Sequence, residues 1–205
     1  MQTSRRSFLV GVGLAGLGIA IPETVHASFA NWSPGRPPRF RSARSVRAPD
    51  RRATLAMRMI CDAVGMERTI ALFSANITKR NVLAFATTWR GKRYIVYDRV
   101  RVPWPETNIP WSSMLVMAHE VGHHVAGHIH RRDIAGKSGE LEADRFAGFA
   151  LARLGASEGQ TLSFFSWDWA ASSSHPSARA RREATREGWN LGERLKEREA
   201  RSLAQ

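Results

Sequence analysis

The stretch WSSMLVMAHEVGHHVAGH, residues 111–128, decides the fold because it joins an apolar helical pattern to side chains that bind metals. His119 and His123 are four residues apart, so on a helix they lie on one face, one turn from each other. Two imidazoles with this spacing can bind one zinc ion, and Glu120 then faces a water molecule on the same metal. The stretch therefore predicts a core helix that carries an HExxH zinc motif.

The residues before the motif argue against a chance match. The alternative interpretation is a polar helix face whose histidines are satisfied by neighbouring side chains. However, residues 114–118 (MLVMA) are all apolar and indicate a buried helix. Buried polar groups without partners are costly, so a metal ion is the partner that His119, Glu120 and His123 require.

A catalytic zinc ion usually needs a third protein ligand. One class of zinc peptidase takes a histidine six residues after the second histidine, with a glycine between them. Those two positions hold Ile129 and Ala126 here, so this class is excluded. Another class takes a carboxylate from the next helix, and the stretch ELEAD at residues 140–144 supplies it. Glu140 is therefore the predicted third ligand.

The same acidic stretch supplies a partner for a ligand histidine. Asp144 lies one turn after Glu140, so it can accept the outer N–H of a ligand imidazole and fix its orientation. Glu142 points elsewhere and is the weaker ligand candidate. An ordinary acidic helix start is the alternative, but it does not explain the combination with HExxH. Structural roles are expected for three histidines that lack ligand spacing: His124, His128 and His130.

Three segments together resemble a peptidase family: HEVGHHVAGH at 119–128, ELEADRFAGF at 140–149 and SSSHPSARARR at 172–182. They are similar to the gluzincin metallopeptidases that include HtpX and the CAAX-prenyl endopeptidases, and more closely to their small soluble exported members. The resemblance extends over about residues 55–189 and includes NVLA at 81–84, where the family has Asn-Ala-Phe-Ala. Because the sequence lacks the family's transmembrane helices, cleavage of lipidated substrates within a membrane is not implied.

The resemblance implies a role for each matching residue. The ligands of one zinc ion that it implies are His119, His123 and Glu140, with Asp144 as the partner of a ligand. It makes Glu120 the catalytic base. It makes His175 and Arg181 a pair in the cleft that could stabilise an oxyanion. Without the resemblance, Arg181 is better interpreted as a solvated arginine of a helix.

The sequence around the motif predicts an α+β fold. A mainly helical, zincin-like metallopeptidase core is expected, with a small antiparallel sheet beside the HExxH helix. Asp50 is a good N-cap for a first helix, and further helices are expected at residues 111–128, 140–154 and 177–203. Strands are expected at residues 69–73, 82–89 and 93–100, with a hairpin turn at Gly91 and Lys92. The strand at 93–100 is expected to be an edge strand that could pair with an extended peptide.

The N-terminal segment is typical of an export signal. Arg5 and Arg6 precede an apolar stretch over residues 8–21, and Ala27 ends a small-residue cleavage site. The residues around the arginine pair (SRRSFL) also resemble the twin-arginine signal. We therefore expect a signal peptide at 1–27, a Pro- and Arg-rich flexible arm at 28–50 and a metallopeptidase domain at 51–205, in the periplasm or secreted. An ordinary Sec signal and an uncleaved membrane anchor are the alternatives.

Composition and charge restrict the partners. The 205 residues are 43% hydrophobic and 24% charged, which is typical of one globular domain and excludes a disordered or multi-span membrane protein. The net charge is +13, and residues 1–27 contribute +1 of it through Arg5, Arg6 and Glu23, leaving +12. No nucleic-acid-binding motif accompanies the charge, so no nucleic acid partner is expected, whereas a peripheral contact with an anionic envelope surface is compatible with it. Cys61 is the single cysteine and is expected to be a buried thiol.

These patterns predict a zinc-dependent metalloendopeptidase with one Zn²⁺ per chain and a protein or peptide substrate. It would hydrolyse peptide bonds of cell-envelope proteins with a metal-activated water. Two alternatives belong to other classes. One is a non-catalytic zinc-binding module of the envelope, and the other is a zinc hydrolase that acts on cell-wall peptides.

Overall fold

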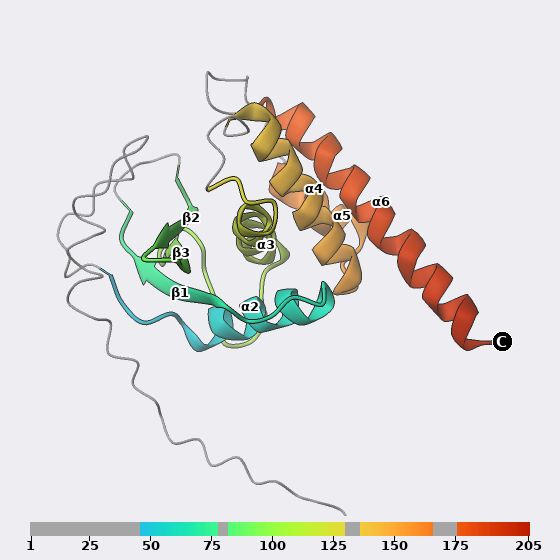
Figure 1. Cartoon of the computed structure of the whole chain (residues 1–205), viewed down its shortest axis with the longest axis horizontal. Coiled ribbons are helices and arrows are strands. Elements are labelled where there is room, and N and C mark those ends of the chain that lie inside the picture. The colour runs from blue at the N-terminus through green and yellow to red at the C-terminus, as the bar shows by residue number, and fades with distance from the viewer. Residues whose placement is uncertain (1–45, 78–81, 130–135, 166–175) are drawn as a thin grey trace, which may run out of the picture.

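The computed structural model describes residues 46–77, 82–129, 136–165 and 176–205, and it shows an α+β fold (Figure 1). The elements along the chain are α2 (Arg51–Ala63), β1 (Ile70–Ala75), β2 (Ala84–Trp89), β3 (Lys92–Asp98), α3 (Trp111–Val125), α4 (Lys137–Arg153), α5 (Glu158–Leu162), the 3-10 helix η2 (Ser163–Phe165) and α6 (Ala178–Leu203). The predicted α+β class is confirmed. The predicted signal peptide and most of the predicted arm lie outside the described residues.

The three strands form one mixed sheet in the order β1-β3-β2. β2 and β3 are antiparallel and join through Arg90 and Gly91, whose φ angles of 47° and 74° suit a tight two-residue turn. β1 runs parallel to β3. The prediction of a purely antiparallel sheet is therefore wrong. The predicted edge position of the strand at 93–100 is also wrong, because β3 lies in the centre and β2 forms an edge.

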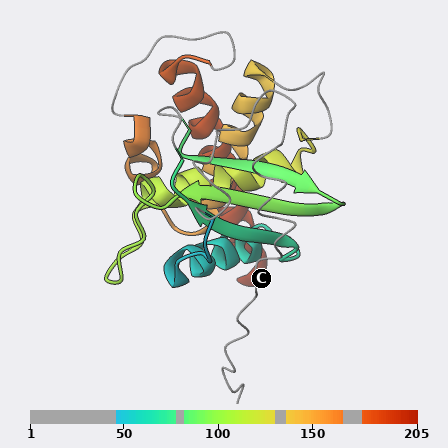
Figure 2. The same cartoon turned by 90° about the vertical axis from the view of Figure 1, so that its left-hand side faces the viewer.

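Helix α3 lies in the middle of the fold, with the sheet on one side and α4 and α6 on the other (Figure 1). Figure 2 shows the sheet from its own side, in front of the helices. The predicted burial of the helix is confirmed, since Met114, Met117 and Val121 are at most 2% exposed. Their packing against β3 and α2 forms the larger of two hydrophobic clusters.

Strand β3 is buried on both faces. Ile95 and Tyr97 pack with α2 and α3, whereas Tyr94 and Val96 pack on the opposite face with Phe73 of β1. Tyr97 also reaches the start of α2, where its hydroxyl donates a hydrogen bond of 2.6 Å to the carboxylate of Asp50. Asp50 occupies the predicted N-cap position, but its side chain makes no cap hydrogen bond because it accepts this distant one instead.

The residues just before α2 cover the outer edge of β1. Val46 is buried in the second cluster. Arg47 and Ser74 exchange two backbone hydrogen bonds of 2.8 and 3.1 Å. Within the described residues, packing therefore begins inside the segment that the sequence predicts to be an arm.

The backbone of α4 closely approaches the backbones of α3 and α6 at glycine positions. A Cβ atom added to Gly148 of α4 would lie 1.9 Å from the carbonyl oxygen of Thr185 in α6. One added to Gly188 of α6 would lie 1.8 Å from the carbonyl oxygen of Arg145. On the other side of α4, Ala143 faces α3 so closely that a Cβ on Gly122 would lie 3.0 Å from its Cα. Small residues therefore fix the distances between these helices.

In the part of the chain that the structure describes, no helix is both long enough and apolar enough to cross a membrane.

Candidate metal centre

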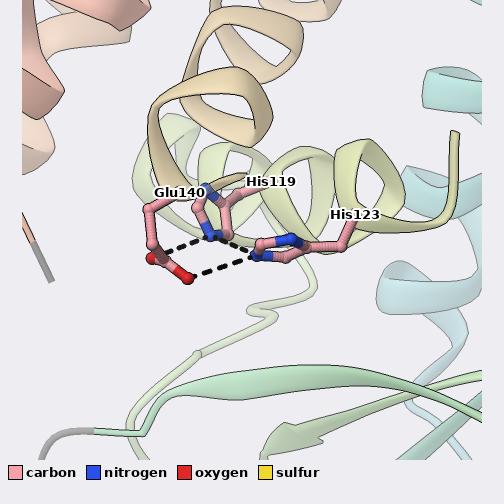
Figure 3. Close-up of side chains that lie close together, drawn as sticks. All are labelled: His119, His123 and Glu140. Carbon is pink, nitrogen blue, oxygen red and sulfur yellow. Dashed lines mark hydrogen bonds and ion pairs between the residues drawn. The ribbon is translucent and has the colours of Figure 1, made fainter. Parts of the chain in front are cut away.

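Three side chains that could hold one metal ion meet where α3 faces the first turn of α4 (Figure 3). His119 and His123 come from α3 and Glu140 comes from α4. The two Nε2 atoms are 3.1 Å apart. The Glu140 carboxylate lies 3.6 Å from His119 Nε2 through Oε2 and 3.5 Å from His123 Nε2 through Oε1. The structure thus brings the three predicted ligands together, and Glu142 is not among them.

Asp144 orients His119, as the sequence predicts. The distance from His119 Nδ1 to Asp144 Oδ1 is 2.8 Å. The ionised carboxylate is only an acceptor, so the hydrogen lies on Nδ1, and Nε2 of a neutral His119 is left able to bind a metal ion. Asp144 is in turn held by Arg181 of α6, which donates from Nε to Oδ2 and from Nη2 to Oδ1, both over 2.7 Å.

His128 is not among the three ligands, as its spacing predicts, but it contacts the second of them. His128 Nδ1 lies 3.0 Å from His123 Nδ1, and its Nε2 lies 2.9 Å from Glu142 Oε2. Sequence reasoning therefore missed that His128 contacts a ligand and that Glu142 contacts His128. Gly127 was the sequence signal for these contacts, since a glycine directly after a helix often folds the next residue back over the last turn.

His124 fits its predicted structural role, because its Nε2 lies 2.9 Å from the carbonyl oxygen of Tyr94 in β3. His130 lies outside the described residues.

Electrostatics at the centre favour a bound cation. Burial raises the pKa of Glu140, but its hydrogen bond with His123 and the nearby positive charges lower that pKa to about 2. Burial likewise opposes ionisation of Asp144, and His119 and Arg181 nevertheless hold its pKa below the ordinary value. Burial lowers the pKa of His123, yet the surrounding carboxylates raise it overall. The carboxylates therefore stay charged and attract a positive charge, which a metal ion can supply.

Glu120 lies beside the triad and is buried. Burial is the main reason why its pKa is raised, although the two ligand histidines and a hydrogen bond from the backbone N–H of Ala86 oppose the shift. A carboxylate with a raised pKa accepts a proton more readily. Such a carboxylate can accept a proton next to the point where the ligand atoms converge.

A cavity of about 400 Å³ opens onto this point. Its polar lining includes the triad, Glu120, Asp144 and Arg181, and its apolar lining includes residues of β2, α3 and η2: Ala84, Ala86, Leu115, Val116, Phe164 and Phe165. The predicted cleft residue Arg181 therefore borders the cavity, but two of its nitrogens bind Asp144. Its predicted partner His175 lies outside the described residues.

Comparison of the chain with protein-family models, with curated proteins and with solved structures finds no match. Three ligand atoms within 4.8 Å of one another, on two tightly packed helices, can hold a metal ion.

Proposed function

We propose that this chain is a zinc-dependent metalloendopeptidase. The observation that carries the proposal is the convergence of acceptor atoms from His119, His123 and Glu140 beside a buried carboxylate. Tetrahedral zinc with ligand bonds of roughly 2.0–2.2 Å requires ligand atoms about 3.3–3.6 Å apart. The two distances from the Glu140 carboxylate, 3.5 and 3.6 Å, lie in that range. The 3.1 Å between the two Nε2 atoms is slightly shorter, so the imidazoles would move apart a little around a zinc ion. Two imidazoles and one carboxylate are also a ligand set of catalytic zinc sites, which keep a fourth position open.

When bound, zinc supplies a Lewis acid that acidifies a water molecule and polarises a carbonyl group. Glu120 would take a proton from the attacking water and deliver it to the nitrogen of the leaving amine. Asp144 keeps His119 in the tautomer that presents Nε2 to the metal, and Arg181 holds Asp144 in place. In this arrangement Arg181 acts through Asp144, and a direct contact with the oxyanion stays a prediction for both Arg181 and His175.

The edge strand β2 favours an extended peptide as the substrate. The backbone N–H of Asp98 donates a hydrogen bond of 2.7 Å to the carbonyl oxygen of Leu83. In this register, alternate residues of β2 form backbone hydrogen bonds with β3. The backbone groups of Ala84 and Ala86 consequently point away from β3 and toward the cavity. A peptide that pairs with this edge would run past Glu120 and the metal. The opposite edge, β1, is covered by Arg47, so β2 is the better candidate for strand addition.

We place the substrate in the cell envelope because of the export pattern in residues 1–27. Proteins or peptides that reach the enzyme in an unfolded or extended form fit the edge-strand geometry best.

The test uses the purified full chain with bound metal measured by elemental analysis and unfolded casein as the probe substrate. We expect about one zinc per chain, casein cleavage, loss of cleavage with a chelator and recovery with added zinc. Zinc binding without cleavage of any peptide would overturn the proposal in favour of a non-catalytic zinc module. Cleavage of cell-wall peptides but not casein would instead support the cell-wall hydrolase.

A further inference from the structure

The end of α3 is folded so that His128 returns to the metal ligand His123. The helix ends at Val125, and Gly127 then adopts a φ of 71°. The backbone N–H of His128 donates to the carbonyl oxygen of His123 over 3.1 Å. This is the bond that defines a Schellman turn, which brings the residue after the glycine against the residue one turn back. Such turns usually carry a hydrophobic contact at this point, whereas here two imidazoles meet.

The hydrogen positions along this contact follow from its outer end. The carboxylate of Glu142 can only accept, so Nε2 of His128, at 2.9 Å, carries a hydrogen. A neutral His128 then has an acceptor at Nδ1, which lies 3.0 Å from Nδ1 of His123. A neutral His123, the form that binds a metal ion, then donates from Nδ1 and keeps a lone pair on Nε2. That Nε2 is the atom that faces His119 and Glu140.

We propose that His128 is a positioning residue for the metal ligand His123, and that Glu142 sets the tautomer of His128. The proposal deepens the proposed function and rests on it. It gives His123 the same kind of support that Asp144 gives His119. Both ligand imidazoles are then fixed from their outer nitrogens, one directly by a carboxylate and the other through a second imidazole.

The burial of His128 and Glu142 indicates how much each contributes to positioning His123. The side chain of His128 is 4% exposed, so water competes little for its bond with His123. The side chain of Glu142 is 54% exposed, so water can replace part of its contribution. Loss of the partner of a ligand histidine typically weakens metal binding by roughly 10–100-fold. We expect a loss in that range when His128 cannot accept, and a smaller loss when Glu142 is neutralised.

The experiment compares the zinc affinity of the full chain in the wild type and four variants by competition with a chelator. His128→Phe removes both ring nitrogens, whereas His128→Asn keeps an oxygen at the δ position that can accept from His123. Glu142→Gln keeps an acceptor but no charge. His124→Gln is the matched control, since it can keep the donor to the Tyr94 carbonyl and changes a neighbouring histidine whose bond runs away from the site. Far-ultraviolet circular dichroism checks that each form is folded.

We expect zinc affinity to fall roughly 10–100-fold in His128→Phe, with partial recovery in His128→Asn and little change in His124→Gln. A long-range ¹H–¹⁵N spectrum of the zinc-loaded wild type should show His128 protonated on Nε2 and His123 on Nδ1. Equal affinity in wild type and a folded His128→Phe would overturn the positioning role while leaving the metal site intact. His128 protonated on Nδ1 would also overturn it. A wild type that binds no zinc would overturn both proposals.

Discussion

Breaking the buried Asp144–Arg181 pair should destabilise the protein far more than breaking an exposed pair between the same two helices. The side chains of Asp144 and Arg181 are 2% and 15% exposed. Those of Arg145 and Glu187 also join α4 to α6 over 2.7 Å but are 48% and 51% exposed. Removing one partner of a buried pair leaves a charge uncompensated and typically costs about 3–5 kcal/mol. An exposed pair contributes roughly 0.2–1 kcal/mol. We therefore expect the free energy of unfolding to fall by about 3–5 kcal/mol in Asp144→Leu. In Glu187→Gln it should fall by only roughly 0.2–1 kcal/mol.

Urea unfolding measured in the presence of a chelator tests this expectation, because bound metal then adds nothing to the stability. The double variant Asp144→Leu/Arg181→Met removes both charges together. It should lose at least about 2 kcal/mol less than the sum of the two single variants. A loss below about 1 kcal/mol in Asp144→Leu would refute the reasoning, since it would mean that Arg181 finds water or another partner at little cost. Equal losses in Asp144→Leu and Glu187→Gln would refute it as well.

Four further outcomes are expected. Glu120→Gln should keep its zinc but lose peptide cleavage by at least roughly 10²–10⁴-fold. Glu140→Gln should instead lose zinc and recover part of its activity when zinc is added. Elemental analysis and peptide assays across a zinc titration check both outcomes. In the metal-free protein, the pKa of Glu140 is lowered from an ordinary 4.5 to about 2, so urea unfolding should show stability falling as the pH drops through that window, and less steeply in Glu140→Gln. Gly188→Ala should destabilise the protein strongly in thermal unfolding, since its Cβ would lie 1.8 Å from a carbonyl oxygen of α4. Changing Arg5 and Arg6 to lysine should retain the protein in the cytoplasm on cell fractionation, and normal processing would instead indicate Sec export.

The ligand set could be predicted from the sequence because it depends on short-range helix geometry. Residues four apart share a helix face whatever surrounds the helix, so His119 and His123 had to point the same way once α3 was recognised. The same reasoning paired Glu140 with Asp144 on α4. The sequence did not predict how closely α3 and α4 approach each other. The small residues Gly122 and Ala143 allow the close approach that brings the ligands together.

The sheet could be predicted only in part because its pairing is not local. The hairpin between β2 and β3 has a turn of two residues, and the sequence signal lies within one residue of it. The parallel pairing of β1 with β3 joins segments that are separated by β2, and no local pattern encodes it. The side chain of Asp50 shows the same limit, since Tyr97, 47 residues away, takes the carboxylate that was expected to cap α2.

Among the described residues, the carboxylates that shape the candidate metal centre from outside α3 all come from one short segment of α4. Glu140 faces the two ligand imidazoles, Asp144 binds His119, and Glu142 reaches His123 through His128. Any shift of α4 relative to α3 would therefore change all of these contacts at once. On its other side, α4 is fixed by the glycine contacts with α6 and by the guanidinium of Arg181. Helix α6 carries none of the three ligands, yet it holds the helix on which the ligand geometry depends, so substitutions in its contact with α4 should act on metal affinity as well as on stability.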